Sequence, residues 1–179
     1  SETYSAAALN ADTWYKRVVI STLNGVPCTK ETAAIKVTVN NVNAGTIISD
    51  QTICIGNDPV SFWTVVPGTG DGAITFQWQS STDGVSFTDI AGADAANYDP
   101  PALAVDTWFK RITRSLLNTV ECTKESNIVK VTVNTVNGGA ITADQTICFG
   151  STPAPFGSSD DGFGSGTVTY QWLRSDNNV

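Results

Sequence analysis

Residues 107–115, Thr-Trp-Phe-Lys-Arg-Ile-Thr-Arg-Ser, decide the fold, because aromatic and β-branched residues dominate them, as is typical of a β-strand. Residues 75–79 (TFQWQ) and 128–133 (IVKVTV) alternate apolar and polar side chains, as half-buried strands do. Turn-forming residues such as those of 67–72 (PGTGDG) separate these runs. No window of a dozen residues keeps a helical period. The sequence therefore predicts an all-β fold.

The same stretch also shows that the sequence repeats. Residues 13–17 (TWYKR) return 94 residues later as residues 107–111 (TWFKR). At the same offset, residues 51–54 (QTIC) return as residues 145–148. About 40 of the 85 comparable positions are identical without a gap, far more than a shared composition gives. The sequence thus predicts tandem repeats of about 94 residues.

Boundaries between repeats are expected where a strand ends and short polar or glycine residues follow, at 40–45 and 134–139. On this phasing, residues 1–41 are the C-terminal half of one repeat, residues 42–135 are a complete repeat, and residues 136–179 are the N-terminal half of the next. About seven short strands in 94 residues is the number expected of an immunoglobulin-like β-sandwich. We therefore expect tandem immunoglobulin-like repeats within a longer parent protein.

The aromatic residues divide into a predicted core and a candidate contact residue. A tryptophan on an early central strand of such a sandwich packs across the core. The residues predicted to be structural core are Trp78, Trp108, Tyr98 and Trp172. Trp63 differs from these, because its counterpart 94 residues later is Gly157. Trp63 is therefore the candidate for ligand contact, with drift of an outer strand as the alternative.

Composition and charge exclude several classes of function. The formal net charge is −7, and the ten basic residues form no run that could follow a phosphate backbone, so no nucleic acid partner is expected. No apolar stretch approaches the roughly 18 residues of a membrane span, so membrane insertion is not expected.

The sequence contains few residues that are suited to catalysis. The chain has no histidine, which removes the usual general base and the Ser-His triads. The acidic doublet Asp160-Asp161 corresponds to Val66-Pro67 one repeat earlier, so paired-carboxylate chemistry would be missing from the neighbouring copy. Loop aspartates such as Asp71 and Asp83 match no calcium-binding loop. We expect no enzyme, no cofactor and no metal site.

The four cysteines occupy two equivalent positions in each period: Cys28 and Cys122, and Cys54 and Cys148. Two cysteines per repeat suggest one disulfide per repeat in an oxidising compartment. The alternatives are a pair within the repeat, Cys54 with Cys122, or pairs across each boundary, Cys28 with Cys54 and Cys122 with Cys148. Head-to-tail stacking would separate the boundary pairs too widely, so the pair within the repeat is favoured. Cys28 and Cys148 would then pair outside the chain, and free buried thiols remain the alternative.

Four segments carry a resemblance to a known family. They are residues 51–56 (QTICIG), 76–93 (FQWQSSTDGVSFTDIAGA), 107–111 (TWFKR) and 122–134 (CTKESNIVKVTVN). Together they resemble the repeats of the giant gliding-motility adhesins of the SprB type. In that family, tandem modules form long filaments on gliding bacteria, are exported by the type IX secretion system and move along the cell surface.

The resemblance implies a role and a location. The chain would be a repetitive stalk segment of an extracellular, outer-membrane-associated filament used for attachment and gliding. Its partners would be the neighbouring repeats, the secretion and motility machinery, and a surface polysaccharide or another adhesion target. The alternative from the residues is an accessory carbohydrate- or protein-binding module of a secreted multidomain protein.

Overall fold

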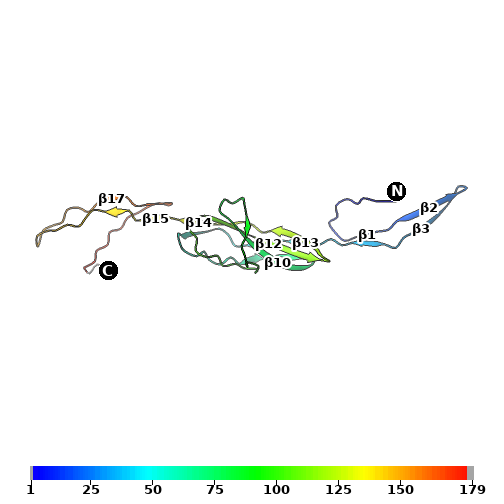
Figure 1. The fold of residues 1–179 in the computed structure, drawn as a ribbon, viewed down its shortest axis with the longest axis horizontal. Helices are drawn as coiled ribbons and strands as arrows, with labels where there is room; N and C mark the ends of the chain where they lie inside the picture. The colour runs from blue at the N-terminus through cyan, green and yellow to red at the C-terminus, as the bar shows by residue number, and fades with distance from the viewer. Residues whose placement is uncertain (1, 177–179) are drawn as a thin grey trace.

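The computed structural model describes residues 2–176, and every regular element in them is a β-strand. The all-β prediction is therefore confirmed. The chain is drawn out along one axis, with a central body between an N-terminal and a C-terminal segment (Figure 1). We refer to residues 42–135 as the central module, to residues 2–41 as the N-terminal segment and to residues 136–176 as the C-terminal segment.

The central module is built around its longest strand, β12 (Thr107–Leu117). The strand order of its main sheet is β11-β10-β12-β14-β7, and β13 also pairs with β12. All pairs are antiparallel except that of β14 with β7, which is parallel. The other members are β7 (Gln51–Cys54), β10 (Ala73–Ser81), β11 (Thr88–Asp89), β13 (Val120–Glu125) and β14 (Val129–Asn134).

Strands β13 and β14 lie end to end along one edge of β12. Strand β13 pairs with residues 112–117 of β12, and β14 pairs with residues 107–109. The chain from Val120 to Asn134 therefore runs the length of the sheet in one direction. This places the β12–β13 hairpin at the end next to the N-terminal segment and the end of β14 next to the C-terminal segment (Figure 1).

A second layer of short strands covers one face of this sheet. It contains two antiparallel pairs, β5 (Val42–Asn43) with β9 (Thr69–Gly70) and β6 (Thr46–Ile47) with β8 (Thr64–Val66). The layers approach closely, because a Cβ atom at Gly68 or Gly70 would lie 2.5 Å from the hydroxyl of Thr113 or Ser115. Glycine at these positions lets backbone pack directly on β12. The result is a sandwich-like fold.

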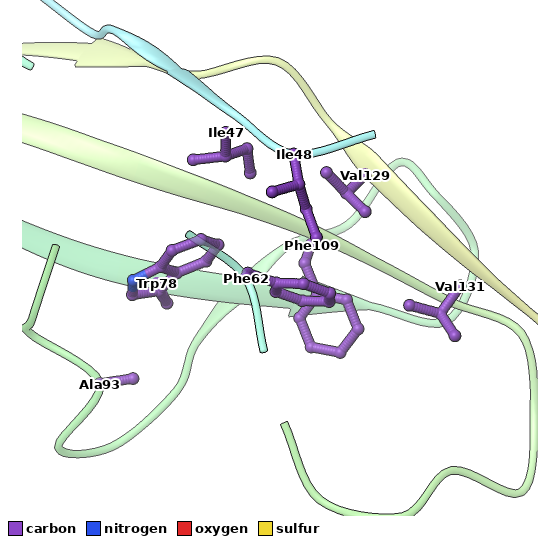
Figure 2. Packing of buried hydrophobic residues seen from close by; sticks show 8 residues of the cluster. All are labelled: Ile47, Ile48, Phe62, Trp78, Ala93, Phe109, Val129 and Val131. Atoms are coloured by element: carbon purple, nitrogen blue, oxygen red, sulfur yellow. The ribbon is translucent and has the colours of Figure 1, made fainter. Parts of the chain in front are cut away.

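The core between the layers is aromatic at one end. Phe62, Trp78 and Phe109 are 0–2% exposed, and Tyr98 packs against them. The rings of Phe62 and Phe109 meet edge to face with centroids 4.9 Å apart. Figure 2 shows the buried apolar cluster, whose members are Ile47, Ile48, Phe62, Trp78, Ala93, Phe109, Val129 and Val131.

The two flanking segments have strand pairs that match those of the central module at an offset of 94 residues. In the N-terminal segment, β1 (Thr13–Tyr15) pairs with β4 (Ile35–Val37), and β2 (Val18–Leu23) pairs with β3 (Val26–Glu31). These match β12 with β14 and β12 with β13. In the C-terminal segment, β15 (Val136–Asn137) pairs with β18 (Phe163–Gly164), and β16 (Ala140–Ile141) pairs with β17 (Ser158–Asp160). These match β5 with β9 and β6 with β8.

Apolar side chains of the flanking segments are exposed where those of the central module are buried. Val129 and Val131 are 0% exposed, whereas their counterparts Ile35 and Val37 are 66% and 40% exposed. The cause is topological, because β14 lies between β12 and β7 while β4 pairs with β1 alone. Of the four predicted core residues, Trp172 differs in the same way, since it is 58% exposed and contacts Phe156 at the edge of the C-terminal segment.

Replacing Trp78 by alanine is expected to destabilise the central module by about 3–5 kcal/mol, because it empties a fully buried indole site and removes a hydrogen bond from the indole N–H to the Ala95 carbonyl. Trp63→Ala is the matched control, since Trp63 is 50% exposed and its loss should change the free energy of unfolding by less than about 1 kcal/mol. Urea unfolding measures both. Equal losses for the two variants would contradict the placement of the core.

Candidate functional site

A guanidinium group lies buried between the two layers of the central module. Arg111 is 0% exposed and lies on the interior face of β12. Its Nη1 atom donates to the Ala96 carbonyl at 2.7 Å and to the Thr64 hydroxyl, and its Nη2 atom donates to the Ala44 carbonyl at 3.2 Å. The guanidinium carbon lies 4.5 Å from the centroid of the Phe76 ring. Arg111 therefore ties β12 to three separate stretches of chain.

No carboxylate accepts from Arg111 in the described chain, so uncharged oxygens and ring faces carry the interaction. Burial lowers the pKa of the guanidinium from its ordinary value, but arginine stays protonated at any physiological pH. A permanently charged donor without a nearby base cannot accept a proton from a substrate. The arrangement therefore serves structure, and it marks where the aromatic part of the core ends.

Beyond Arg111, the interior of the module becomes polar and leads to the boundary with the N-terminal segment. Thr113 donates to the Ala44 carbonyl at 2.9 Å, and Ser115 donates to the side-chain carbonyl of Asn40 at 2.7 Å. The Asn40 amide in turn donates to the carbonyls of Ser115 and Val120, at 2.7 and 3.0 Å. A single asparagine side chain thus joins the end of one segment to the β12–β13 hairpin of the next.

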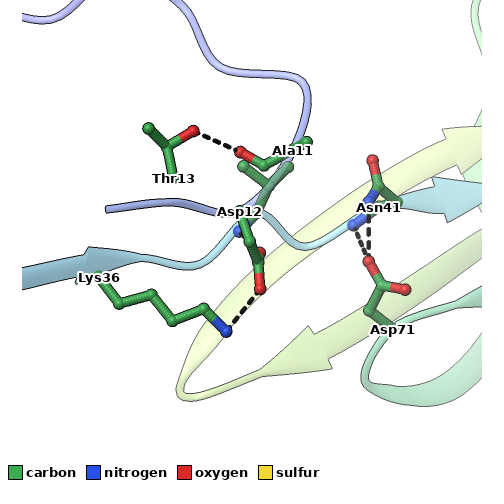
Figure 3. A network of polar contacts seen from close by, with 7 residues as sticks. Ala11, Asp12, Thr13, Lys36, Asn41 and Asp71 are labelled. Atoms are coloured by element: carbon green, nitrogen blue, oxygen red, sulfur yellow. Dashed lines mark hydrogen bonds and ion pairs between the residues drawn. The ribbon is translucent and has the colours of Figure 1, made fainter. Parts of the chain in front are cut away.

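The neighbouring residue completes the junction. The Asn41 backbone and side-chain amides both donate to the Asp71 carboxylate, at 2.8 and 2.9 Å, and the Asp71 backbone N–H donates back to the Asn41 carbonyl at 3.1 Å. Figure 3 shows the Asn41–Asp71 contacts together with the ion pair of Asp12 and Lys36, which lies before the junction. The linker between the two parts is therefore fixed by several hydrogen bonds.

The boundary with the C-terminal segment has related contacts. The Thr135 N–H donates to the Ser165 hydroxyl at 2.9 Å, and the Ser165 N–H donates to the Thr135 carbonyl at 3.0 Å. The Ser165 hydroxyl also donates to the side chain of Asn134 at 2.9 Å. Thr135 and Ser165 lie 94 residues after Asn41 and Asp71, so a shorter hydroxyl takes the place of the carboxylate.

The cysteines do not lie as the sequence prediction placed them. All four are free, and the predicted bridge between Cys54 and Cys122 is not formed. In the strand register, Cys54 lies beside Asn134 and Cys122 lies opposite Ser115. Asn134 and Ser115 are at opposite ends of the sheet, roughly 35 Å apart at about 3.3 Å per strand residue. A disulfide needs Cα atoms within about 7 Å, so these two thiols cannot meet within the module.

The predicted aromatic residues take different positions. Trp78 and Tyr98 belong to the aromatic core, with ring centroids 5.6 Å apart. Trp108 is partly buried on the outer face of β12, where the Lys130 ammonium lies 5.0 Å from the centroid of its ring. Trp63, the candidate for ligand contact, is half exposed just before β8. Among residues 2–176, no aromatic ring pairs with that of Trp63.

The acidic residues are not gathered into a site. Among residues 2–176, no three His, Cys, Asp or Glu side chains are close enough together to hold a metal ion. Asp71 binds the junction backbone, and Asp83 closes its own turn by accepting from Ser81 and from the N–H groups of Val85 and Ser86. Asp160 ends the short strand β17 at the surface. The Asp71 and Asp83 carboxylates thus stabilise a linker and a turn.

An open hollow in the N-terminal segment is a core face without a cover. It is lined by Tyr4, Tyr15, Ile35 and Val37 among others. Their counterparts in the central module, 94 residues later, are Tyr98, Phe109, Val129 and Val131, which belong to or pack against the core. The ring pair Tyr4–Tyr15, at 5.9 Å, matches Tyr98–Phe109, at 6.2 Å. The hollow therefore corresponds to the packed core face of the central module.

The fold and its contacts define an all-β chain whose central module is sandwich-like. A family model described as "Domain of unknown function (DUF8696)" matches residues 43–135, and the chain belongs to this family. No curated protein and no solved structure matches the chain. Residues 2–176 contain no helix that is long and apolar enough to span a membrane.

Sequence reasoning missed Asn40, Ser115 and Arg111 as the residues that organise the module and its junction. A signal for them exists, because each is identical to its counterpart 94 residues away: Asn134, Ser21 and Arg17. Small polar residues and arginine are mostly exposed in proteins, so their residue types do not mark these positions as interior. Only the placement of the second layer over β12 shows that they are enclosed.

The turn at Asp83 gives a pH-dependent contribution to stability. Hydrogen bonds from Ser81, Ser86 and Val85 hold the pKa of Asp83 well below its ordinary value of about 3.9. The unfolded chain therefore takes up a proton near pH 4 while the folded chain does not, so this contribution is present above pH 4 and lost as the pH falls further. Asp83→Asn should be less stable at pH 7 and should lose less stability than the wild type between pH 5 and pH 2. Parallel stability curves in urea would contradict this role.

Proposed function

We propose that the chain is part of a stalk made of tandem immunoglobulin-like modules, belonging to a large exported surface adhesin of the gliding-motility type. The junctions carry this proposal, because the same linker positions are hydrogen-bonded at both ends of the central module. A linker that is fixed at each boundary suits a filament that must hold its length. A flexible tether would need no such contacts.

The recurrence of detail at 94 residues supports the tandem arrangement. The ion pairs Lys16–Glu31 and Lys36–Asp12 have counterparts in Lys110–Glu125 and Lys130–Asp106. The ring pair Phe156–Trp172, at 5.9 Å, corresponds to Phe62–Trp78, at 5.7 Å. The family match over residues 43–135 lies within one residue of the period expected from the sequence. Each flanking segment thus carries part of the aromatic cluster that the central module has whole.

The mechanism of the proposed stalk is mechanical. Each module resists extension through the backbone hydrogen bonds of β12 with its neighbours, its aromatic core and the Arg111 contacts. The net charge of −7 keeps parallel filaments apart by repulsion at low salt. An exposed location, an anchor in the outer membrane and export by the type IX system follow from the resemblance to SprB-type adhesins and are part of this proposal.

Surface display is tested in the bacterium that produces the protein. Antibodies raised against residues 42–135 should label intact cells in immunogold electron microscopy, with gold particles extending outward from the cell surface. Deleting the gene should abolish this label and reduce cell attachment and gliding on a solid surface. Label confined to the cytoplasm of sectioned cells, with normal attachment and gliding in the deletion strain, would contradict the proposal.

The half-exposed Trp63 favours a second candidate function, an accessory module that binds carbohydrate or protein. An exposed indole can stack on a sugar ring. If this module binds a surface polysaccharide, Trp63→Ala should lower its retention on immobilised polysaccharide at least tenfold, and Val65→Ala, a neighbouring exposed position, should leave retention unchanged. Equal retention of wild type and both variants would remove Trp63 as a contact residue.

A further inference from the structure

The two cysteine positions of the central module, Cys54 and Cys122, lie at its opposite ends, next to its two boundaries. Within the central module, Cys54 lies at the end that leads to the C-terminal segment, and Cys122 lies at the end that faces the N-terminal segment. If modules follow each other at 94 residues, as proposed above, the far end of one module carries a Cys54-type thiol and the near end of the next carries a Cys122-type thiol.

The contacts of Asn40 show how near these two positions come. Asn40 lies 94 residues before Asn134, and Asn134 lies beside Cys54 in the parallel register of β14 and β7. A Cys54-type residue of the preceding module is therefore one strand away, about 4.8 Å, from Asn40. Asn40 itself contacts the hairpin of the central module through Ser115 and Val120.

The thiol of Cys122 is turned toward this same contact. Ser115 and Cys122 are directly opposite in the antiparallel pair of β12 and β13, so their side chains share one face of the hairpin. The Ser115 hydroxyl reaches the Asn40 side chain at 2.7 Å on that face. By the same rule, a Cys54-type residue beside Asn40 points to the face on which the Asn40 side chain lies. Both thiols thus border one asparagine.

We infer that Cys122 forms a disulfide with the cysteine at the Cys54 position of the preceding module, and Cys54 with the hairpin cysteine of the following module. This inference rests on the tandem arrangement of the proposed function. Two thiols lose two protons and two electrons as the S–S bond forms, and a disulfide of a thiol-disulfide oxidant takes these up and becomes a dithiol. Cys54 is exposed and Cys122 is partly exposed, so the oxidant has access to each thiol.

Such bridges would link neighbouring modules of the stalk covalently and make the stalk more rigid. Each module would be joined to its neighbours by the backbone and by one disulfide at each end. The disulfide would lie next to the hydrogen bonds that Asn40 and its counterparts make with the hairpin of the next module. The bridge would restrict rotation at the junction, whereas a bridge within the module would leave the junction free. With this pairing, the cysteines stabilise the junctions between modules rather than the interior of each module.

The test is peptide mapping of the full-length protein from its native cells, alkylated with iodoacetamide and digested with trypsin without reduction. Cleavage isolates Cys122 in residues 115–124 and Cys54 in residues 37–110. The expected result is residues 115–124 linked to a peptide of another module, and residues 37–110 likewise. A direct link between residues 115–124 and residues 37–110, or alkylated thiols in both peptides, would overturn the inference.

The variant Cys122→Ser separates the two pairings in the same protein. With bridges at the junctions, residues 37–110 remain linked in this variant, because the partner of Cys54 belongs to the following module. With a bridge inside the module, the same peptide is released with an alkylated Cys54, which overturns the inference. Immunogold labelling of cells does not depend on thiols, so failure of this pairing and failure of the proposed surface role give different results.

Discussion

The buried guanidinium of Arg111 is the constraint on which the rest of the module depends. A charge enclosed in a protein must be compensated by hydrogen bonds, and an unpaired polar partner costs about 1–3 kcal/mol. Here the compensation comes from the carbonyls of Ala44 and Ala96 and from the hydroxyl of Thr64, which lie on three separate stretches of chain. The Nη atoms of Arg111 reach these acceptors only when the three stretches are folded over β12, so their contacts specify how the chain is placed there, while the buried Nε atom has no hydrogen-bond partner among the described residues.

Arg111 divides the interior face of β12 into two halves that make different contacts. On one side of Arg111, Phe109 joins the aromatic core that stabilises the module. On the other side, Thr113 and Ser115 contact the second layer and, through Asn40, the preceding segment. The polar half would be a weakness in an isolated domain. In this chain it provides the contact between the central module and the N-terminal segment.

The sequence predicted the β-strands well because their signal is local. The alternation at residues 75–79 and 128–133 corresponds to β10 and β14, and residues 107–115 fall within β12. Trp78 was expected at the core and is fully buried there. The 94-residue offset, visible in the sequence, also relates the short strand pairs of the flanking segments to those of the central module.

What the sequence could not supply depends on which strands become neighbours. The cysteine prediction treated the two positions as close, whereas pairing of β13 and β14 along the same edge of β12 places them at opposite ends. The exposure of Trp172 has a similar origin, because the strand neighbours that bury Trp78 have no counterparts in residues 136–176. Both differences arise from long-range pairing, which no local pattern encodes.

Single-molecule pulling on the full-length protein tests whether equal β-modules follow one another along the chain. Under reducing conditions, which remove any effect of disulfides, we expect successive rupture events of similar force that each release an equal length of chain. At about 3.3–3.6 Å per residue, a module of 94 residues releases roughly 30 nm. Unequal increments, or extension without distinct rupture events, would show that the chain is not built of equal modules.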